Sequence, residues 1–356
     1  MKTILSIILL VFSFASFAQQ DTLLWSDEFN GTGPPDPANW SYDLGTNNGW
    51  GNQEIQIYTN STQNSYQENG SLFIKALKSY TTWTSARIIT RNKVSFTYGR
   101  VVFRAKLPAG SGTWPALWLL GQNLSTAGWP ACGEIDVMEH AGKNPGIVHS
   151  ALHSSSSSGN TVNTKTTTVA NFNTEFHLYE ARWTPEKIEF SVDSNLFYTY
   201  NPAVKNESTW PFHRPFFLIM NIAMGGTFGS DPQYETNGLK NGIDPSLYYA
   251  IMEIDYVRVY KFSYPASIGE PGDINKKNGT GSLFFSPNPA NGKIHIQLMP
   301  GKEAKGTLYD IVGNDVLHFQ ASDVSPEIDI SSLAKGIYLI SIESEGIYKT
   351  NKLVVN

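Results

Sequence analysis

Short runs that alternate apolar and polar residues follow one another between residues 23 and 262. Clear examples are 71–76, 101–107 and 187–193, and clusters of Gly, Pro, Asn and Ser separate the runs. A period of two is typical of β-strands with one buried face, and no long stretch has the period of an amphipathic helix. Many short strands without long helices predict an all-β sandwich.

One run is apolar at nearly every position. It covers residues 215–224, PFFLIMNIAM, and the glycines at 225 and 226 end it. A strand that is covered on both faces shows this pattern, because neither set of alternating side chains meets water. We therefore expect a central strand here.

The composition changes after the long alternating region. Residues 264–282, YPASIGEPGDINKKNGTGS, are rich in Gly, Pro, Asn and Lys, which is typical of a linker. New short strands follow at 294–298, 305–310, 336–342 and 348–355, enough for a small β-sandwich. The expected segments are a leader (1–18), a large β domain (19–262), a linker (263–282) and a small C-terminal β-sandwich (283–356).

The leader has the composition of a secretory signal peptide. Lys2 precedes an apolar stretch that starts at Ile4, and small residues at 15, 16 and 18 precede Gln19. The stretch is too short to span a bilayer, and no other stretch approaches the roughly 20 apolar residues that a membrane helix needs. We expect an exported monomer with no membrane span.

Charge and cysteine content narrow the function classes. The formal net charge of -5 argues against nucleic acid as a partner, since that would favour clustered Lys and Arg. Cys132 is the single cysteine and rules out an intramolecular disulfide. The exported chain must therefore be held together by packing, and by a metal if it binds one.

Aromatic residues are unusually frequent for a chain with so few charges. They make up 13% of the residues against 16% charged residues, with nine Trp and 17 Tyr. Sugar rings pack on aromatic faces, so surplus rings beside amide side chains favour carbohydrate as a ligand. Core packing remains the alternative for most individual rings.

The segment 134–139, EIDVME, carries the candidate chemistry. In a regular strand Glu134 and Asp136 share a face, while Glu139 points to the opposite face. One extra residue at 137–138, a β-bulge, would turn Glu139 to the face of the other two, and bulges are over-represented beside active sites. A solvated acidic edge strand is the alternative, but like charges stacked together cost stability.

Three carboxyl groups on one face suit the hydrolysis of a glycosidic bond. Retention of configuration needs two carboxyls about 5–5.5 Å apart, one to attack the anomeric carbon and one to protonate the leaving oxygen. Charges so close cannot all ionise, so we expect at least one proton to be held near neutral pH. We expect the side chains of Glu134 and Glu139 to converge over the shorter Asp136.

The segment 134–139 resembles the signature of glycoside hydrolase family 16 in its bulged form. The resemblance extends from residue 24 to 260, and its blocks are similar to the laminarinase branch of that family. These blocks are 25–31 (WSDEFNG), 49–54 (GWGNQE), 85–88 (SARI), 98–100 (YGR), 114–118 (WPALW) and 254–260 (IDYVRVY).

The resemblance implies a β-jelly-roll of two curved sheets with an open concave groove, and endo-hydrolysis of β-1,3-glucan by double displacement. It implies Glu134 as nucleophile, Asp136 as its assisting group and Glu139 as general acid/base, with no cofactor for catalysis. The residues that it implies along the groove are Asn52, Glu54, Arg87, Trp114, Trp118, Trp129 and His153. Plain core packing is an alternative for Trp118, which two leucines flank.

Two rival functions stay open. The same fold could act on mixed-linked β-glucan, agarose or carrageenan, although the tryptophan blocks at 50–52 and 114–116 favour β-1,3-glucan. A protein that binds glucan without cutting it is the rival outside enzymes, and the presence of all three carboxylates argues against it.

The family resemblance also implies a structural calcium ion, held by Glu28, Gly70 and Asp255. Oxygen ligands suit calcium, and the ion would join the two ends of the domain. Ordinary surface acids at Glu28 and Asp255 are the alternative.

The C-terminal segment resembles the sorting domain of proteins exported by the type IX secretion system. Its blocks are 286–289 (SPNP), 308–313 (LYDIVG), 333–338 (LAKGIY) and 349–353 (KTNKL). This implies the secretion machinery as a partner and a location outside the cell or on its surface. A sugar-binding module is the alternative, but the segment has no tryptophan.

Overall fold

The structure is a computed structural model that describes residues 21–262, 284–298, 301–310, 315–323, 326–344 and 347–356. The predicted signal peptide and linker lie outside these residues and stay predictions. Contacts divide the chain into two compact units, one of which is Asp21–Phe262, while the other contains the described residues from 284 onward. Within the described part of the chain, no helix combines the length and apolar character needed to cross a membrane.

Strands dominate the larger unit, and its helices are single turns. The strands are β1 (Asp21–Asp27), β2 (Ser41–Tyr42), β3 (Ile57–Tyr58), β4 (Ser65–Glu68), β5 (Ser71–Ser79), β6 (Thr82–Ser85), β7 (Arg87–Ile89), β8 (Ser95–Phe96), β9 (Gly99–Lys106), β10 (Thr113–Gly121), β11 (Glu134–His140), β12 (Ile147–His153), β13 (Thr164–Thr168), β14 (His177–Trp183), β15 (Ile188–Val192), β16 (Asn195–Tyr200), β17 (Phe216–Met224) and β18 (Tyr249–Phe262). The helical turns are η1 (Asn47–Gly49), α1 (Leu124–Ala127), α2 (Gly226–Gly229) and η2 (Pro232–Tyr234).

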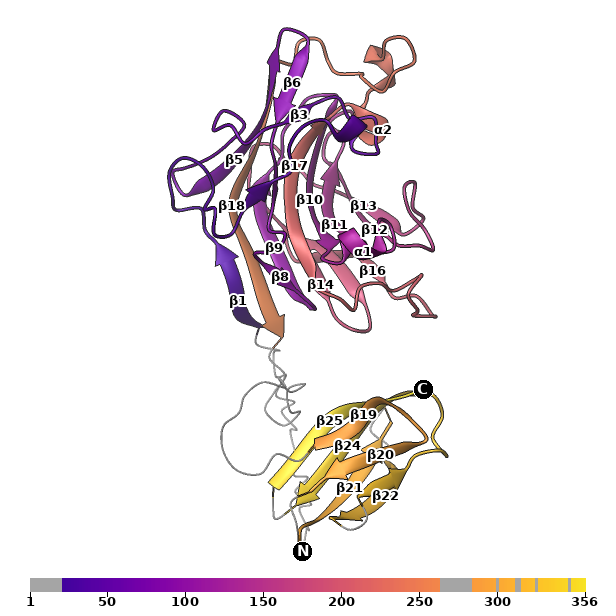
Figure 1. Cartoon of the computed structure of the whole chain (residues 1–356). Helices are drawn as coiled ribbons and strands as arrows, with labels where there is room; N and C mark the ends of the chain where they lie inside the picture. The colour runs from indigo at the N-terminus through magenta and orange to yellow at the C-terminus, as the bar shows by residue number, and fades with distance from the viewer. Residues whose placement is uncertain (1–20, 263–283, 299–300, 311–314, 324–325, 345–346) are drawn as a thin grey trace, which may run out of the picture. The chain divides into compact units, whose positions relative to one another are not determined.

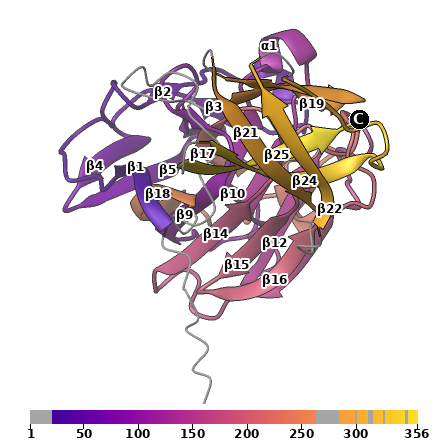
Figure 2. The same cartoon turned by 90° about the horizontal axis from the view of Figure 1, so that it is seen from below.

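The larger unit is a two-sheet β-jelly-roll (Figure 1). In the described residues, one sheet has ten strands in the order β16-β15-β14-β9-β18-β5-β6-β3, with β1 on β18 and β4 on β5. The other has eight strands in the order β13-β12-β11-β10-β17-β7-β2, with β8 on β17. Figure 2 shows β14, β15 and β16 side by side at one edge of the ten-stranded sheet. The predicted all-β fold is confirmed.

The main core lies between the two sheets, and β17 runs through the middle of the eight-stranded sheet. Every residue of β17 is buried, as predicted from the apolar run. Alternate residues from Phe216 to Met224 join the main core. On the opposite face, Phe217 and Ile219 belong to a second buried cluster with Ile89, Leu120 and Cys132. The face of the eight-stranded sheet that points away from the main core is here called the site face.

The smaller unit is a separate all-β fold. Its described strands are β19 (Phe284–Asn291), β20 (Lys293–Gln297), β21 (Glu303–Tyr309), β22 (Asp315–Ser322), β23 (Glu327–Asp329), β24 (Gly336–Ser344) and β25 (Ile347–Val355). They follow one path, β22-β21-β24-β25-β19-β20-β23, in which β19 joins two groups of strands. Both groups contribute to one buried cluster, for example Ile294 from β20 and Ile340 from β24. This unit therefore has a hydrophobic core of its own.

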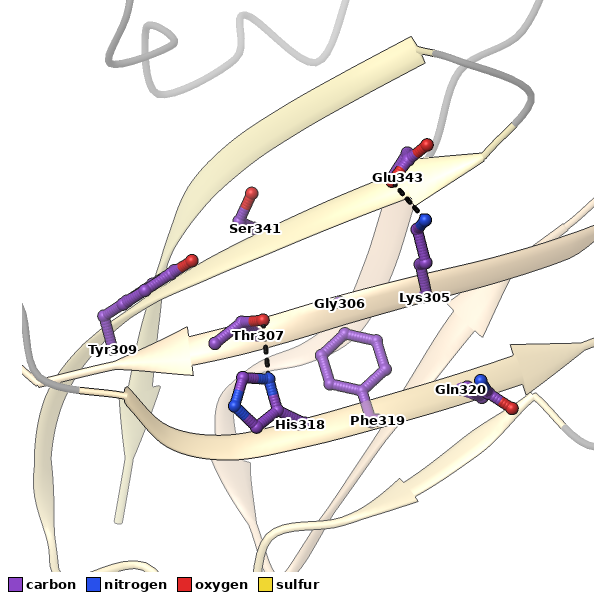
Figure 3. A pocket seen from close by; sticks show the side chains of 9 residues that line it. All are labelled: Lys305, Gly306, Thr307, Tyr309, His318, Phe319, Gln320, Ser341 and Glu343. Atoms are coloured by element: carbon purple, nitrogen blue, oxygen red, sulfur yellow. Dashed lines mark hydrogen bonds and ion pairs between the residues drawn. The ribbon is translucent and has the colours of Figure 1, made fainter.

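A shallow hollow of about 600 Å³ lies on the polar face of β21, β22 and β24. Figure 3 shows Lys305 directed toward Glu343 and Thr307 toward His318. The first pair is an ion pair of 3.0 Å and the second a hydrogen bond of 3.0 Å. The hollow is in the smaller unit and contains none of the predicted catalytic residues.

Candidate active site

The predicted bulge in β11 is present. Toward β12, Asp136 lies opposite Ala151 but Glu139 lies opposite His149, so β11 has one residue more than its neighbour. Toward β10, the extra residue falls between Asp136 and Met138. Residues Val137 and Met138 both belong to the main core. The consequence is that Glu139 returns to the face that Glu134 and Asp136 occupy.

Register with β10 places the three acids in a row on the site face. Glu134, Asp136 and Glu139 lie opposite Leu120, Trp118 and Ala116, which alternate along one face of β10. Asp136 is buried, whereas both glutamates keep partial contact with solvent. The two glutamates are thus accessible to a ligand on either side of a buried carboxyl group.

At the Glu134 end, an indole and an imidazole contact the carboxylates. The Trp129 Nε1–H donates to Glu134 Oε2 at 2.9 Å. His153 Nε2 lies 3.1 Å from Asp136 Oδ2 and 3.7 Å from Glu134 Oε1. The Trp129 ring is 48% exposed, so it is available to contact a ligand.

At the Glu139 end, a second indole plays the same part. The Trp114 Nε1–H donates to Glu139 Oε1 at 2.9 Å. The Trp114 ring packs against Phe228 with 5.3 Å between ring centroids, and Phe228 packs edge-on against His149 at 5.0 Å. Each outer glutamate is therefore oriented by one tryptophan N–H.

Burial raises the pKa values of all three acids. Desolvation and the neighbouring Asp136 charge raise the pKa of Glu134 and of Glu139 to about 8. Burial raises the pKa of Asp136 well above its usual range. His153 lowers the pKa of both glutamates, and Glu54 raises that of Glu139 further. The row therefore holds at least one proton near neutral pH, which a general acid requires.

A stacked arginine lies beside the row on the site face. The Arg87 guanidinium lies 4.6 Å from the Trp50 ring centroid and 4.8 Å from that of Trp118, and it pairs with Asp43 at 3.1 Å. Trp118 lies opposite Asp136 and donates its Nε1–H to Asn221 Oδ1 at 2.8 Å. Trp118 is thus a half-buried residue of the site face, and no part of the main core.

A buried network anchors Glu54. It accepts hydrogen bonds from Gln56 Nε2 at 2.7 Å, from the Tyr58 hydroxyl at 3.2 Å and from Asn52 Nδ2 at 3.4 Å. Tyr58 in turn accepts from Asn221 Nδ2 at 3.0 Å. Burial raises the pKa of Glu54. Through Tyr58, the network connects Asn52 and Glu54 to Asn221, which also accepts the Trp118 N–H.

Four residues near the acids were not predicted. They are Tyr58, His149, Asn221 and Phe228. The signal for Asn221 was visible, because it is the polar residue within an otherwise apolar strand. His149 reaches the site through strand register, and Phe228 through the chain reversal at Gly225 and Gly226. The sequence marks that turn by its two glycines but does not show which residues His149 and Phe228 then contact.

The predicted calcium ligands carry other partners. Arg258 donates to both oxygens of Glu28, at 2.9 and 2.7 Å, and Arg104 donates to Asp255 Oδ2 at 2.5 Å. Gly70 follows β4 with a φ of 77°. Two guanidinium groups thus balance the two carboxylates, and side-chain coordination of calcium would require the carboxylates to leave these ion pairs.

A second set of residues has ligand atoms close enough for a cation. One oxygen each of Glu134 and Asp136 and one nitrogen of His153 all lie within 4.8 Å of one another. Trp129 already donates to Glu134, and His153 lies within ion-pair distance of both carboxylates, so contacts among protein side chains account for this geometry.

Two family models match the chain. The model for glycosyl hydrolases family 16 matches residues 51–256, and the model for the secretion system C-terminal sorting domain matches residues 285–356.

Relatives and solved structures agree with the first match. A beta-glucanase of Rhodothermus marinus is 44% identical over 253 residues, which cover 67% of this chain and 85% of the relative. A glucan endo-1,3-beta-glucosidase of Cryptopygus antarcticus is 35% identical over 243 residues, which cover 63% of this chain and 88% of the relative. The crystal structure of a laminarinase from Flavobacterium sp. UMI-01 is 45% identical with a TM-score of 0.62, and the match covers 67% of this chain and all of that one. The chain therefore belongs to glycosyl hydrolases family 16, with a C-terminal secretion sorting domain.

Proposed function

We propose that this protein hydrolyses internal β-1,3-glucosidic bonds of laminarin-type β-glucans with retention of configuration. The observation that carries the proposal is the β11 bulge, which gathers Glu134, Asp136 and Glu139 on one face with an indole N–H at each outer glutamate. The relatives and the solved structure named above are glucanases that fit this substrate class. Family 16 hydrolases need no catalytic cofactor, and the residues of the row can supply both the nucleophile and the proton.

The first step forms a covalent ester. The Glu134 carboxylate attacks the anomeric carbon, the bond from that carbon to the leaving oxygen breaks, and Glu139 gives its proton to the leaving oxygen. The Trp129 N–H, bonded to Glu134 Oε2, orients the attacking carboxylate. Asp136 and His153 lie beside Glu134 and act on the pKa of its carboxyl group. Asp136 raises this pKa and His153 lowers it.

The second step reverses the roles. Glu139, now ionised, takes a proton from a water molecule, whose oxygen attacks the anomeric carbon and releases Glu134. Two inversions restore the β configuration. Asn52, Glu54, Arg87, Trp114, Trp118, Trp129 and His153 are proposed to bind the sugar units. Arg87 and the exposed Trp129 ring offer, respectively, a donor for hydroxyl groups and a platform for a sugar face.

The deciding experiment measures reducing ends released from laminarin by wild type, Glu134→Gln and Glu139→Gln. Loss of the acid/base is expected to lower kcat about 10²- to 10⁴-fold, and loss of the nucleophile at least as much, with binding of laminarin oligosaccharides retained. A panel of mixed-linked β-glucan, agarose and carrageenan runs in parallel. Wild-type binding without turnover would identify a glucan-binding protein, and cleavage of agarose without cleavage of laminarin would replace the substrate.

Calcium binding stays a separate prediction for Glu28, Gly70 and Asp255. An ion that binds only the folded state raises Tm as its concentration rises above Kd. The measurement is Tm in calcium and in EDTA, with magnesium as control. An unchanged Tm would refute the prediction.

We further propose export by a type IX secretion system, with the C-terminal unit recognised by the secretion machinery. The match of the sorting-domain model to residues 285–356 supports this. Fractionation of cells that express full-length and truncated chains tests it, and export of the truncated chain would contradict it. Monomeric state and removal of the predicted signal peptide are tested by mass measurement of the exported protein.

A further inference from the structure

The short helix α2 packs directly against the tryptophan that orients Glu139. Its chain turns at Gly225 and Gly226, both with positive φ, directly after β17. The Gly225 N–H donates to Gly112 O, the Gly226 N–H to Lys240 O and the Thr227 N–H to Asn52 O, each at 2.8 Å. Three separate chain segments therefore fix the position of this turn.

Trp114 contacts α2 through glycines that have no room for a side chain. A Cβ on Gly229 would lie 2.9 Å from Trp114 Cβ, and a Cβ on Gly226 would lie 3.2 Å from Trp114 Cζ3. The Phe228 ring covers the indole from the same helix, with 5.3 Å between ring centroids. The indole is thus held at its stem, at its six-membered ring and by a neighbouring aromatic ring.

The other end of the row lacks this arrangement. Trp129, which donates to Glu134, is 48% exposed. Trp114, which donates to Glu139 Oε1, is half-buried beneath α2. Trp114, which donates to the proposed proton donor Glu139, is therefore held by more contacts with neighbouring groups than Trp129.

We propose that α2, through Gly229 and Phe228, is the positioning element of the acid/base. It holds the Trp114 N–H on Glu139 Oε1, so that the proton is carried on the other oxygen, which faces the leaving group. This inference rests on the proposed role of Glu139. Gly229 and Phe228 act through Trp114 and are positioning residues.

The inference makes a prediction that a merely structural role does not. If α2 serves proton donation, disturbing it should lower kcat/KM for substrates whose leaving group needs a proton. It should leave kcat/KM nearly unchanged for substrates whose leaving group does not. The Trp114 hydrogen bond also lowers the pKa of Glu139. Loosening that bond should therefore raise this pKa and move the basic limb of the pH profile of kcat/KM to higher pH.

The experiment uses the full-length protein and two substrates, a laminarin oligosaccharide and a 2,4-dinitrophenyl β-laminaribioside. Gly229→Ala adds a methyl group against Trp114 at a backbone conformation that any residue adopts, and Phe228→Leu removes the covering ring without adding bulk. Gly31→Ala is the matched control, because its Cβ would meet no more than the amide end of Gln67, at 3.0 Å. Circular dichroism and Tm establish that each variant is folded. If Gly229→Ala does not fold, the inference is tested on Phe228→Leu alone.

We expect kcat/KM for the oligosaccharide to fall at least about 10-fold in both variants, with the dinitrophenyl substrate changed less than about 2-fold, and with Gly31→Ala like wild type. An equal loss on both substrates would overturn the inference. Glu139→Ala is measured alongside to separate the two proposals. If it shows the leaving-group selectivity and the α2 variants do not, the positioning role alone fails; if Glu139→Ala also lacks the selectivity, the proposed acid/base role fails.

Discussion

A carboxyl group that donates a proton near neutral pH has to be kept from ionising, and the surroundings of Glu139 do this in two ways. Burial and the Asp136 charge raise its pKa, and the buried Glu54 adds to the effect. The Trp114 hydrogen bond and His153 act in the opposite direction. The proton affinity of Glu139 is therefore set by one neighbour on its own strand, Asp136, and by others that come from other strands and from a loop.

The substitution Glu54→Gln tests the electrostatic part of this arrangement. It removes a negative charge that raises the pKa of Glu139, so that pKa should fall. Since the acid must be protonated to work, the basic limb of kcat/KM should move to lower pH. A pH profile with a laminarin oligosaccharide measures the limb. An unchanged limb with an altered KM would show that Glu54 acts on substrate binding alone.

The buried acids should also cost stability. Glu139, the proposed proton carrier, has a pKa of about 8 in the fold against an ordinary 4.5. Between these values the unfolded state releases a proton that the folded state keeps, so stability falls as pH rises, by at most about 1.4 kcal/mol per pH unit.

We therefore expect Glu139→Gln to raise Tm above wild type at pH 8 and to have little effect near pH 4.5. The measurement is Tm across this range, with the exposed Glu186→Gln as control. A Tm difference that does not depend on pH would contradict the argument.

Sequence reasoning singled out Glu134, Asp136 and Glu139 as candidate catalytic residues, because three acids interleaved with core residues are visible within one short segment. It could not identify the contact of Tyr58 with Asn221, whose positions are 163 residues apart. Such contacts depend on strand order across a sheet, and local pattern does not determine that order. Phe228 was missed for the same reason, since it lies in α2 and packs against Trp114 on β10, which is distant in the sequence.

At the scale of elements, the alternation of apolar residues predicted strands well where one face or both faces are buried. The uniform burial of β17 is the clearest case. The bulge in β11 was predicted from chemistry, because a regular strand would have separated the three acids. Short elements such as α2 were not predicted, since single turns have no periodicity to detect.

The bulge predicts an unusual pair of stability effects. Adjacent residues of a regular strand point to opposite faces, but Val137 and Met138 are 2% and 0% exposed and both face the main core. We expect Met138→Ala to cost about 2–5 kcal/mol in urea unfolding, and Val137→Ala to be destabilising as well, with KM unchanged in each folded variant. A neutral effect at either position would place that side chain outside the core and contradict the bulge.

At the scale of the whole molecule, the described residues form two units that have separate buried clusters. The composition change after residue 262 predicts a linker between them, because a run of Gly, Pro, Asn and Lys does not build a core, and the predicted domain bounds stay predictions. The predicted leader lies outside the described residues, so its removal rests on the sequence alone.

A chain that ends at residue 262 should keep the activity. All predicted catalytic and sugar-binding residues belong to Asp21–Phe262, whose core does not depend on the smaller unit. We expect kcat/KM on laminarin oligosaccharides within about twofold of the full-length value. Purified truncated and full-length proteins are compared at equal concentration of folded protein. A large loss would show that the smaller unit takes part in substrate binding.

The second buried cluster has a consequence for the conditions that the protein tolerates. Cys132 is 0% exposed within it, and burial together with the Glu134 charge raises the pKa of its thiol to about 11. Peroxides and disulfide reagents react with exposed thiolates, and this group offers neither exposure nor ionisation at neutral pH. The activity of the folded enzyme should thus not depend on the thiol redox potential of its surroundings, and neither thiol-directed oxidants nor reducing agents should change it.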